Sequence, residues 1–260
     1  MKRRLFFSCV FIFIVVFSNA YAAGLEIAVG GWQQSVSGTL SYAALSDQDI
    51  IDLEKDLNFD DEARVSGRAK IDLPLFLPNI YLVAAPMEFE GTGTKATSFK
   101  FGDFEFDAAA TLESKLTANQ YDVGFYYGLP FVNTGTLGRL NIDVGLNVRF
   151  VDLKARIRGS DANNPGTVVE ESKSITAPIP MLYLGVQFMP VEALAIEAEG
   201  RGIAVGDNKL YSLTGRVRYN FAGPVFLAGG YRYDKLEIDE DDVVSDIEFQ
   251  GPFVELGLKF

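Results

Sequence analysis

Apolar and polar residues alternate along much of this chain. The clearest example is the segment 139–150, in which every second residue is apolar: Leu140, Ile142, Val144, Leu146, Val148 and Phe150. A period of two predicts a β-strand with one apolar face and one polar face. The polar face carries Arg139, Asp143 and Arg149, and the core of an ordinary β-sandwich does not hold such charges. We therefore expect the apolar face to point outward and the charged face to point inward.

The length of this segment fits a strand that crosses a membrane. Its 12 residues, at about 3.3 Å each and tilted near 40°, rise roughly the height of the apolar band on a membrane β-barrel. Beyond Phe150 the pattern changes phase, because the apolar residues of 151–157 alternate with Lys154, Arg156 and Arg158. The phase change predicts either a β-bulge or a strand that projects beyond the membrane.

Nine further segments show a similar alternation, so the sequence predicts about ten strands. An even count suits an all-β fold, a closed antiparallel up-and-down transmembrane β-barrel with both chain ends on one side. Counts of eight or twelve stay open, because glycine-rich and loop-proximal segments are ambiguous. The nine apolar rows lie within 25–29, 65–73, 81–89, 121–129, 182–188, 194–198, 211–219, 225–233 and 254–260.

Connection lengths and aromatic residues orient the predicted barrel. Long loops are expected at 39–62, 91–115 and 159–169, and the opposite connections are short; outer-membrane barrels have long external loops and short periplasmic turns. Two aromatic girdles are expected, one of Tyr81, Tyr127, Phe188, Tyr219, Phe221 and Phe260, the other of Phe89, Phe150, Tyr211 and Tyr233. The alternative is a soluble β-sandwich or a lipocalin-like barrel, with the apolar rows inside.

The first 22 residues have the form of a secretory signal peptide. Lys2, Arg3 and Arg4 precede a 13-residue apolar run, and Ala20 to Ala22 supply an Ala-x-Ala cleavage site. The run is shorter than the roughly 20 residues of a spanning helix. Cleavage after Ala22 would remove the one cysteine, Cys9, and leave residues 23–260 as an exported barrel.

The last eight residues alternate and end on phenylalanine, Phe253 to Phe260. This run resembles the terminal strand of Gram-negative outer-membrane β-barrels, and the resemblance makes Phe260 a signal for the barrel assembly machinery. With the segments 99–104, 116–122 and 125–130, the whole chain resembles a family of small outer-membrane β-barrel proteins of unassigned function. The resemblance implies a porin-like fold in the cell outer membrane, in contact with lipid and lipopolysaccharide, with external loops and periplasmic termini. It implies no reaction.

The inward rows carry charges of both signs in nearly equal number. Small barrels have interiors just wide enough for side chains to fill, and unpaired ions there are costly. We therefore expect a salt-bridged plug, with a selective pore as the alternative. The nine acidic and ten basic candidates are Glu26, Asp72, Glu88, Asp122, Asp143, Glu197, Glu199, Asp234 and Glu255, and Arg64, Arg68, Lys70, Arg139, Arg149, Arg201, Arg216, Arg218, Arg232 and Lys259; all except Glu88, Lys70 and Lys259 form the predicted ion-pair network.

The acidic excess of the chain, whose net charge is −12, falls on the predicted loops. Loop 39–62 holds eight acidic residues and one lysine, and 239–242 is entirely acidic. A solvated, repulsive surface is the main expectation, and weak binding of Ca²⁺ or Mg²⁺ is the alternative. The spacing of Ile50, Ile51, Leu53 and Leu57 also predicts a short amphipathic helix there.

Residues 99–106 predict a two-residue β-hairpin. Two aromatic arms meet at Gly102 and Asp103, which fits a type II′ turn with glycine in the first central position. The four phenylalanines of this hairpin predict either packing against the barrel rim or an exposed binding tip.

The chain contains no histidine. This absence excludes a Ser-His-Asp triad and His-ligated zinc, and enzymes of the outer-membrane barrel architecture use a catalytic histidine. A paired-carboxylate mechanism at Glu197 and Glu199 is conceivable, but lumen ion pairs explain them more simply. A net-acidic chain without a basic tract is also a poor nucleic-acid ligand. We expect a structural or surface-interaction barrel without enzymatic activity or cofactor; the alternative is a small channel or transporter for ions or small solutes.

Overall fold

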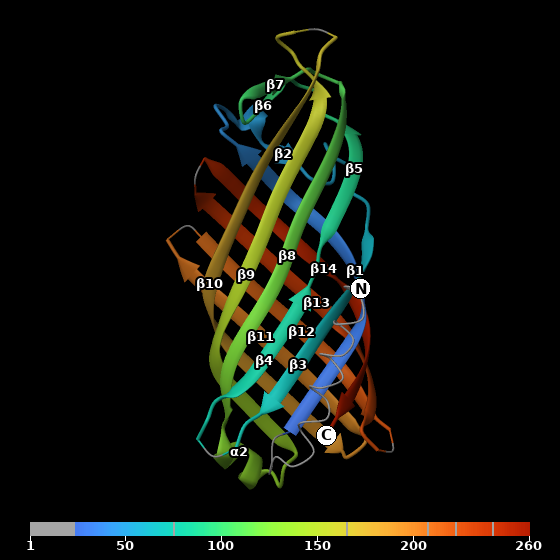
Figure 1. Ribbon diagram of the computed structural model, residues 1–260, viewed down its shortest axis with the longest axis vertical. Helices are drawn as coiled ribbons and strands as arrows, with labels where there is room; N and C mark the ends of the chain where they lie inside the picture. Colours follow the sequence, from blue (N-terminus) through green and yellow to red (C-terminus); the bar gives the residue numbers. More distant parts are fainter. Residues whose placement is uncertain (1–23, 75, 165, 207, 222, 241) are drawn as a thin grey trace, which may run out of the picture.

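The computed structural model describes residues 24–260 except 75, 165, 207, 222 and 241, so the predicted signal peptide lies outside the described residues. The predicted closed antiparallel barrel of ten strands is confirmed (Figure 1). Each strand pairs with its neighbour in sequence, and the last pairs with the first to close the wall. The strands are β1 (Gly24–Tyr42), β3 (Glu62–Asp72), β4 (Asn79–Ala85) continued by β5 (Glu88–Thr94), β8 (Thr111–Gly128), β9 (Leu140–Ser160), β10 (Val168–Val191), β11 (Leu194–Val205), β12 (Asn208–Asn220), β13 (Val225–Glu240) and β14 (Val243–Lys259).

The two ends of the barrel differ. The short-turn end carries the helix α2 (Pro130–Gly135) and the brief connections before β11 and β13. The long-loop end carries the 3₁₀ turn η2 (Asp47–Asp49), β2 (Ile51–Asp52) and a separate hairpin of β6 (Phe99–Phe101) and β7 (Phe104–Phe106). Strands extend into all three predicted loops: β1 runs to Tyr42, β5 and β8 occupy the ends of 91–115, and β10 starts at Val168.

The prediction of an amphipathic helix near Ile50 is wrong. The segment forms η2, β2 and turns instead. Three of its four apolar residues, Ile51, Leu53 and Leu57, are nevertheless fully buried. The spacing therefore identified residues that face inward, but these residues do not form a helix.

Strand β9 shows why the sequence changes phase after Phe150. Its register with β8 is unbroken from Asp143 to Arg158, and its register with β10 is unbroken along its whole length. The β-bulge alternative is therefore wrong, and the odd-numbered residues point inward throughout. The odd-numbered residues of β9 thus stay on the inward face along the whole strand. Up to Phe150 the inward residues are mostly polar and the outward ones apolar; after Phe150 the inward residues are apolar and the outward ones polar.

The barrel consequently has two tiers. In the lower tier, next to the short-turn end, apolar side chains point outward and are exposed; we call this surface the apolar belt, and it includes Ile27, Val29, Leu82, Phe125, Leu146, Leu182, Leu184, Val217, Leu227, Val254 and Leu256. In the upper tier, apolar side chains point inward; we call this cluster the upper core, and it includes Val36, Leu40, Met87, Phe89, Leu116, Val151, Leu153, Ile157, Leu236, Ile247 and Phe249.

Strand length requires a second tier. β9 has 21 residues, which at about 3.3 Å each and a tilt near 40° rise about 50 Å, roughly twice the height of the apolar band of a membrane barrel. Residues beyond the band face water, so the outer surface there is polar and the inside can pack like a soluble core.

The segment 79–94 lies with its faces opposite to prediction. Tyr81, Ala85, Met87 and Phe89 are buried inside the barrel, whereas Leu82 is exposed on the belt. Tyr81 and Phe89 therefore belong to neither girdle, and Glu88 lies outside the lumen row. Both faces of 80–85 are apolar, so alternation there cannot decide which face points inward.

The wall has a seam between β10 and β11. Their ladder begins at Leu182 and Gly202, and the next two pairs in this register would be Met181 with Ile203 and Pro180 with Ala204. Pro180 has no N–H to donate, so the ladder ends there. Above the seam β10 pairs only with β9 among the described strands, and the wall of β8, β9 and β10 rises higher than β11 and β12 (Figure 1).

The hairpin predicted at 99–106 is confirmed. Phe99 pairs with Phe106 and Phe101 with Phe104, and Gly102 takes a φ of +64°, which a type II′ turn requires at this position. Three of the four phenylalanines are buried in the upper core. The hairpin thus packs its aromatic side chains into the barrel end and does not present them as an exposed tip.

Candidate functional site

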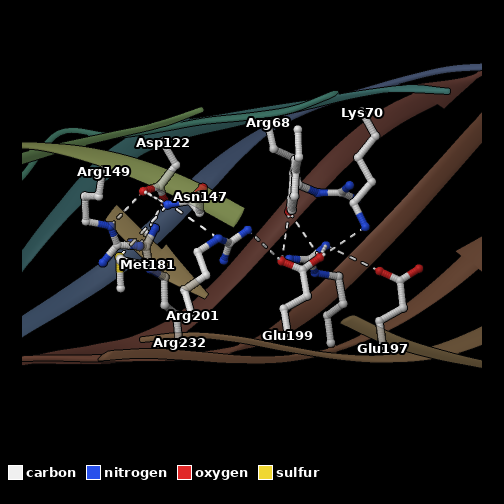
Figure 2. Close-up of polar contacts among 12 residues, drawn as sticks. Arg68, Lys70, Asp122, Asn147, Arg149, Met181, Glu197, Glu199, Arg201 and Arg232 are labelled. Carbon is white, nitrogen blue, oxygen red and sulfur yellow. Dashed lines mark hydrogen bonds and ion pairs between the residues drawn. The ribbon is translucent and has the colours of Figure 1, made fainter. Parts of the chain in front are cut away.

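Charged side chains converge in the lower-tier lumen from opposite sides of the wall. The first group surrounds Asp122 of β8 (Figure 2). Arg149 of β9 donates to both oxygens of Asp122, at 2.8 Å from Nε and 2.9 Å from Nη2, and this bidentate geometry is the strongest form of such a pair. Arg149 also reaches Asp234 of β13 at 3.4 Å, and Asp234 forms an ion pair with Arg232 at 2.8 Å. The four side chains are nearly or fully buried.

The second group surrounds Glu199 of β11. Arg201 and Arg216 lie 3.2 and 3.1 Å from its carboxylate, and Lys70 of β3 lies 3.4 Å away. The hydroxyl of Tyr81 donates to the same carboxylate at 2.9 Å. Glu199 therefore meets three cations and a hydroxyl in one buried position.

Further ion pairs extend the second group around the wall. Arg218 of β12 lies 2.9 Å from Glu26 and 3.0 Å from Glu197. Arg68 of β3 pairs with Glu26 and with Glu255 of β14, the latter at 2.7 Å. Figure 2 shows Arg201 between the two groups; its Nε lies 4.0 Å from Asp122. The two groups thus form one network, which we call the ion-pair layer.

The ion-pair layer includes twelve of the predicted network residues, six carboxylates and six guanidiniums: Glu26, Asp122, Glu197, Glu199, Asp234 and Glu255, with Arg68, Arg149, Arg201, Arg216, Arg218 and Arg232. Lys70 adds a seventh cation, so the carboxylates of the layer are fully compensated. Removing one member of such a buried pair leaves an uncompensated charge, which costs about 3–5 kcal/mol.

Four predicted network residues lie outside the layer. Arg139 is exposed just before β9. Arg64 is part-exposed near Glu62 and Glu88, at 3.7 and 3.5 Å. Asp72 and Asp143 face the open end of the lumen. Phe260, the predicted assembly signal, is exposed, and its backbone N–H donates to Leu25 at 2.8 Å.

An aromatic layer lies within this site, and no feature of the sequence predicts it. Tyr81, Tyr126 and Tyr183 form a buried cluster with edge-to-face rings 5.7 and 5.8 Å apart. The ammonium of Lys70 lies 4.6 Å from the Tyr81 ring, and the guanidinium of Arg201 lies 4.9 Å from it. Cations favour the faces of aromatic rings. Tyr81 and Tyr183 stand in largely apolar segments, and no motif marks them.

Two cavities lie in the lumen, one on either side of the second group. A cavity of about 40 Å³ lies near Arg68, Arg201 and Trp32. A cavity of about 220 Å³, which we call the cup, lies at the short-turn end. Above the ion-pair layer, the upper core fills the interior with buried apolar side chains.

An apolar outer belt around a closed antiparallel barrel with a charged interior decides the architecture. This is the fold of an outer-membrane β-barrel. No described helix is long and apolar enough to cross a membrane. The interior of the barrel can bind or exclude solutes. Among the described residues, no group of three or more acidic, histidine or cysteine side chains is arranged to hold a metal ion.

Comparison with known proteins yields structural neighbours only. No protein-family model and no curated protein matches the chain. Among solved structures, the barrel is similar to the attachment invasion locus protein Ail of Yersinia pestis, at 10% identity over 92% of this chain and 99% of that one, with a TM-score of 0.37. It is similar to the translocator domain of the autotransporter NalP from Neisseria meningitidis, at 10% identity over 100% and 94%, with a TM-score of 0.44. It is also similar to the outer membrane protein AlkL, at 11% identity over 94% and 93%, with a TM-score of 0.35.

Proposed function

We propose that this protein is a closed outer-membrane barrel that holds a rigid, surface-exposed upper tier above the lipid. One observation carries the proposal: two successive layers fill the lumen. The ion-pair layer crosses it at Glu199 and Asp122, and the upper core fills it above. A continuous water path needs polar groups that solvent can reach, and the upper core offers buried apolar side chains instead.

The orientation follows from the two ends. The upper tier carries charged outward side chains, such as Lys154, Arg156 and Arg158, and belongs on the outer side because long loops of outer-membrane barrels face outward. The termini and short turns then face the periplasm. Lipid contacts the belt, lipopolysaccharide surrounds the base of the upper tier, and Phe260 serves the barrel assembly machinery. Weak divalent-cation binding at the acidic loops remains a prediction from sequence.

The alternative, a small channel, needs both layers to open. An enzymatic role has less support, because the chain has no histidine and because the paired carboxylates Glu197 and Glu199 are held by arginines at 3.0–3.3 Å. A carboxylate held in this way stays charged and is poorly placed for proton transfer.

Cysteine accessibility tests the orientation. Ser174→Cys places a thiol on the outward face of β10 in the upper tier, and Glu192→Cys places a thiol at the short-turn end; both positions are exposed. In intact cells, a membrane-impermeant maleimide should label position 174 and should label position 192 only after the outer membrane is permeabilised. The reverse pattern would contradict the orientation.

Solute flux tests the closed lumen. Liposomes that contain the refolded barrel should swell no faster in an arabinose solution than empty liposomes do. A variant that lacks residues 97–108, and with them the β6–β7 hairpin, should also stay closed because the ion-pair layer remains. Swelling with the native chain would support the channel and overturn the proposal.

A further inference from the structure

Two carboxylates of the cup at the short-turn end have no ion pair among the described residues. Five carboxylates line it, together with Lys70, Arg218 and Lys259. Glu26, Glu197 and Glu199 are each paired with arginines of the ion-pair layer. Among the described residues, neither Asp72 nor Asp143 has an ion pair. Two carboxylates therefore face a cavity without a cation in ion-pair contact, although Lys70 and Lys259 line the same cavity.

The wall next to these carboxylates also holds an unpaired hydroxyl. Tyr183 is only 4% exposed, and its Oη has no hydrogen-bond partner among the described residues. This atom lies over Gly185, where a Cβ would stand only 2.6 Å from Oη and 3.4 Å from the Cβ of Asp143. Gly185 and Asp143 both line the cup. The missing side chain at 185 thus leaves room for a buried, unpaired polar atom beside the free carboxylate.

We propose that the cup binds a small organic ammonium ion. Carboxylates that lack an ion pair in a confined space favour a cationic partner. A protein-held metal fits poorly, because no group of three or more such ligands is arranged for one among the described residues. An ammonium group suits the walls, because the tyrosine layer already accepts one: the ammonium of Lys70 lies 4.6 Å from the Tyr81 ring and 5.7 Å from the Tyr126 ring.

The lining assigns roles to the neighbouring groups. Asp143 is half-buried and supplies the central charge. Asp72 is held by the Tyr126 hydroxyl, which donates to it at 3.1 Å, so its second oxygen is free for a ligand. The amides of Asn79, Asn141 and Gln187 line the same cavity and supply neutral hydrogen bonds to hydroxyl or amine groups. Such a lining, with a few placed polar groups in a concave site, is typical of small-ligand sites.

Calorimetric titration of the full refolded barrel in detergent micelles at low ionic strength tests the site. The probe is 1,4-diaminobutane, and the native protein should give saturable binding. Asp143→Asn should weaken binding about tenfold or more, because a charge-assisted hydrogen bond is lost. Glu192→Gln removes a carboxylate from the same end outside the cup and should leave the affinity unchanged.

Folding of the variants is checked by the shift of the band between unheated and boiled gels. Asp143 has no ion pair among the described residues, so its variant should shift like the native protein; Asp72→Asn serves if it does not. Absence of saturable binding, or equal binding by Asp143→Asn, would overturn the site. Mg²⁺ binding as tightly as the diamine, with the same dependence on Asp143, would overturn the organic class of ligand. The closed lumen does not depend on this result, because the cup lies below the ion-pair layer.

Discussion

Several contacts in the lumen converge on Glu199. Its carboxylate meets Arg201, Arg216 and Lys70 within 3.4 Å. These contacts come from three strands, so a single side chain joins β3, β11 and β12. Glu199 stabilises the fold because it compensates positive charges whose burial would otherwise be costly.

Glu199→Gln keeps the shape of this side chain and removes its charge. We expect the free energy of unfolding to fall by about 3–5 kcal/mol, because three buried cations lose their shared partner. Urea unfolding of the refolded barrel in micelles measures this change. Glu192→Gln, an exposed change on a turn, should have little effect; equal losses in the two variants would contradict the role of Glu199.

A second pair of substitutions tests the inverted segment 79–94. Leu82→Arg places a charge on the apolar belt and should cost about 2–4 kcal/mol if the position lies near the bilayer midplane. Tyr81→Phe should cost about 1.5–3 kcal/mol, because the hydrogen bond to the charged Glu199 is lost. Folding into lipid vesicles measures both values. A Leu82→Arg variant as stable as the native chain would show that Leu82 does not point toward lipid, and a Tyr81→Phe variant of unchanged stability would show that Tyr81 does not donate to Glu199 in the lumen.

At the scale of elements, the sequence predicted the strands well and their ends poorly. Alternation identified all ten strands of the barrel wall, because lipid outside and charge inside impose a period of two. It failed where both faces are apolar, as in 80–85. Upper-tier strands were assigned to loops because their chemistry is inverted, and the pairing that extends them joins residues far apart in the chain. The cup was missed because it forms only when strands from the whole wall close.

The seam beside β10 has a cause that one substitution can remove. Pro180→Val supplies the missing N–H opposite Ala204 and should extend the β10–β11 ladder by two pairs, through Ile203 to Ala204. Hydrogen–deuterium exchange should then show a protected amide at position 180 and slower exchange at Ala204. Exchange at 180 as fast as in a free strand edge would show that another feature keeps the seam open.

The contact between η2 and the β6–β7 hairpin at the long-loop end should weaken in acid. Burial raises the pKa of Asp49, but backbone N–H groups of Lys100, at 2.7 Å, Leu45 and Ser46 donate to its carboxylate and hold the pKa below its usual value. A lowered folded pKa gives stability that is present above the unfolded value of about 3.9 and is lost as pH falls through the folded value. The protection factor of the Lys100 amide should therefore decline below about pH 4. Asp49→Asn should reduce it at neutral pH; a factor independent of pH in the native protein would contradict this role of Asp49.

The whole molecule combines two solutions to the burial of side chains in one continuous wall. In the lower tier apolar side chains face lipid, and the ion-pair layer lies in the lumen. In the upper tier polar side chains face water, and apolar side chains fill the lumen. The carboxylates of the ion-pair layer are compensated by its cations, so the acidic excess of the chain, whose net charge is −12, lies outside that layer, on the loops and the upper tier.

Ions are the smallest solutes that can test whether the lumen is closed. Recordings from planar bilayers that contain the purified, folded barrel measure their passage, with a known porin as a positive control for insertion. We expect no steady unitary conductance at either polarity, because the ion-pair layer and the upper core both obstruct the path. Steady unitary steps from the native chain would contradict the closed lumen.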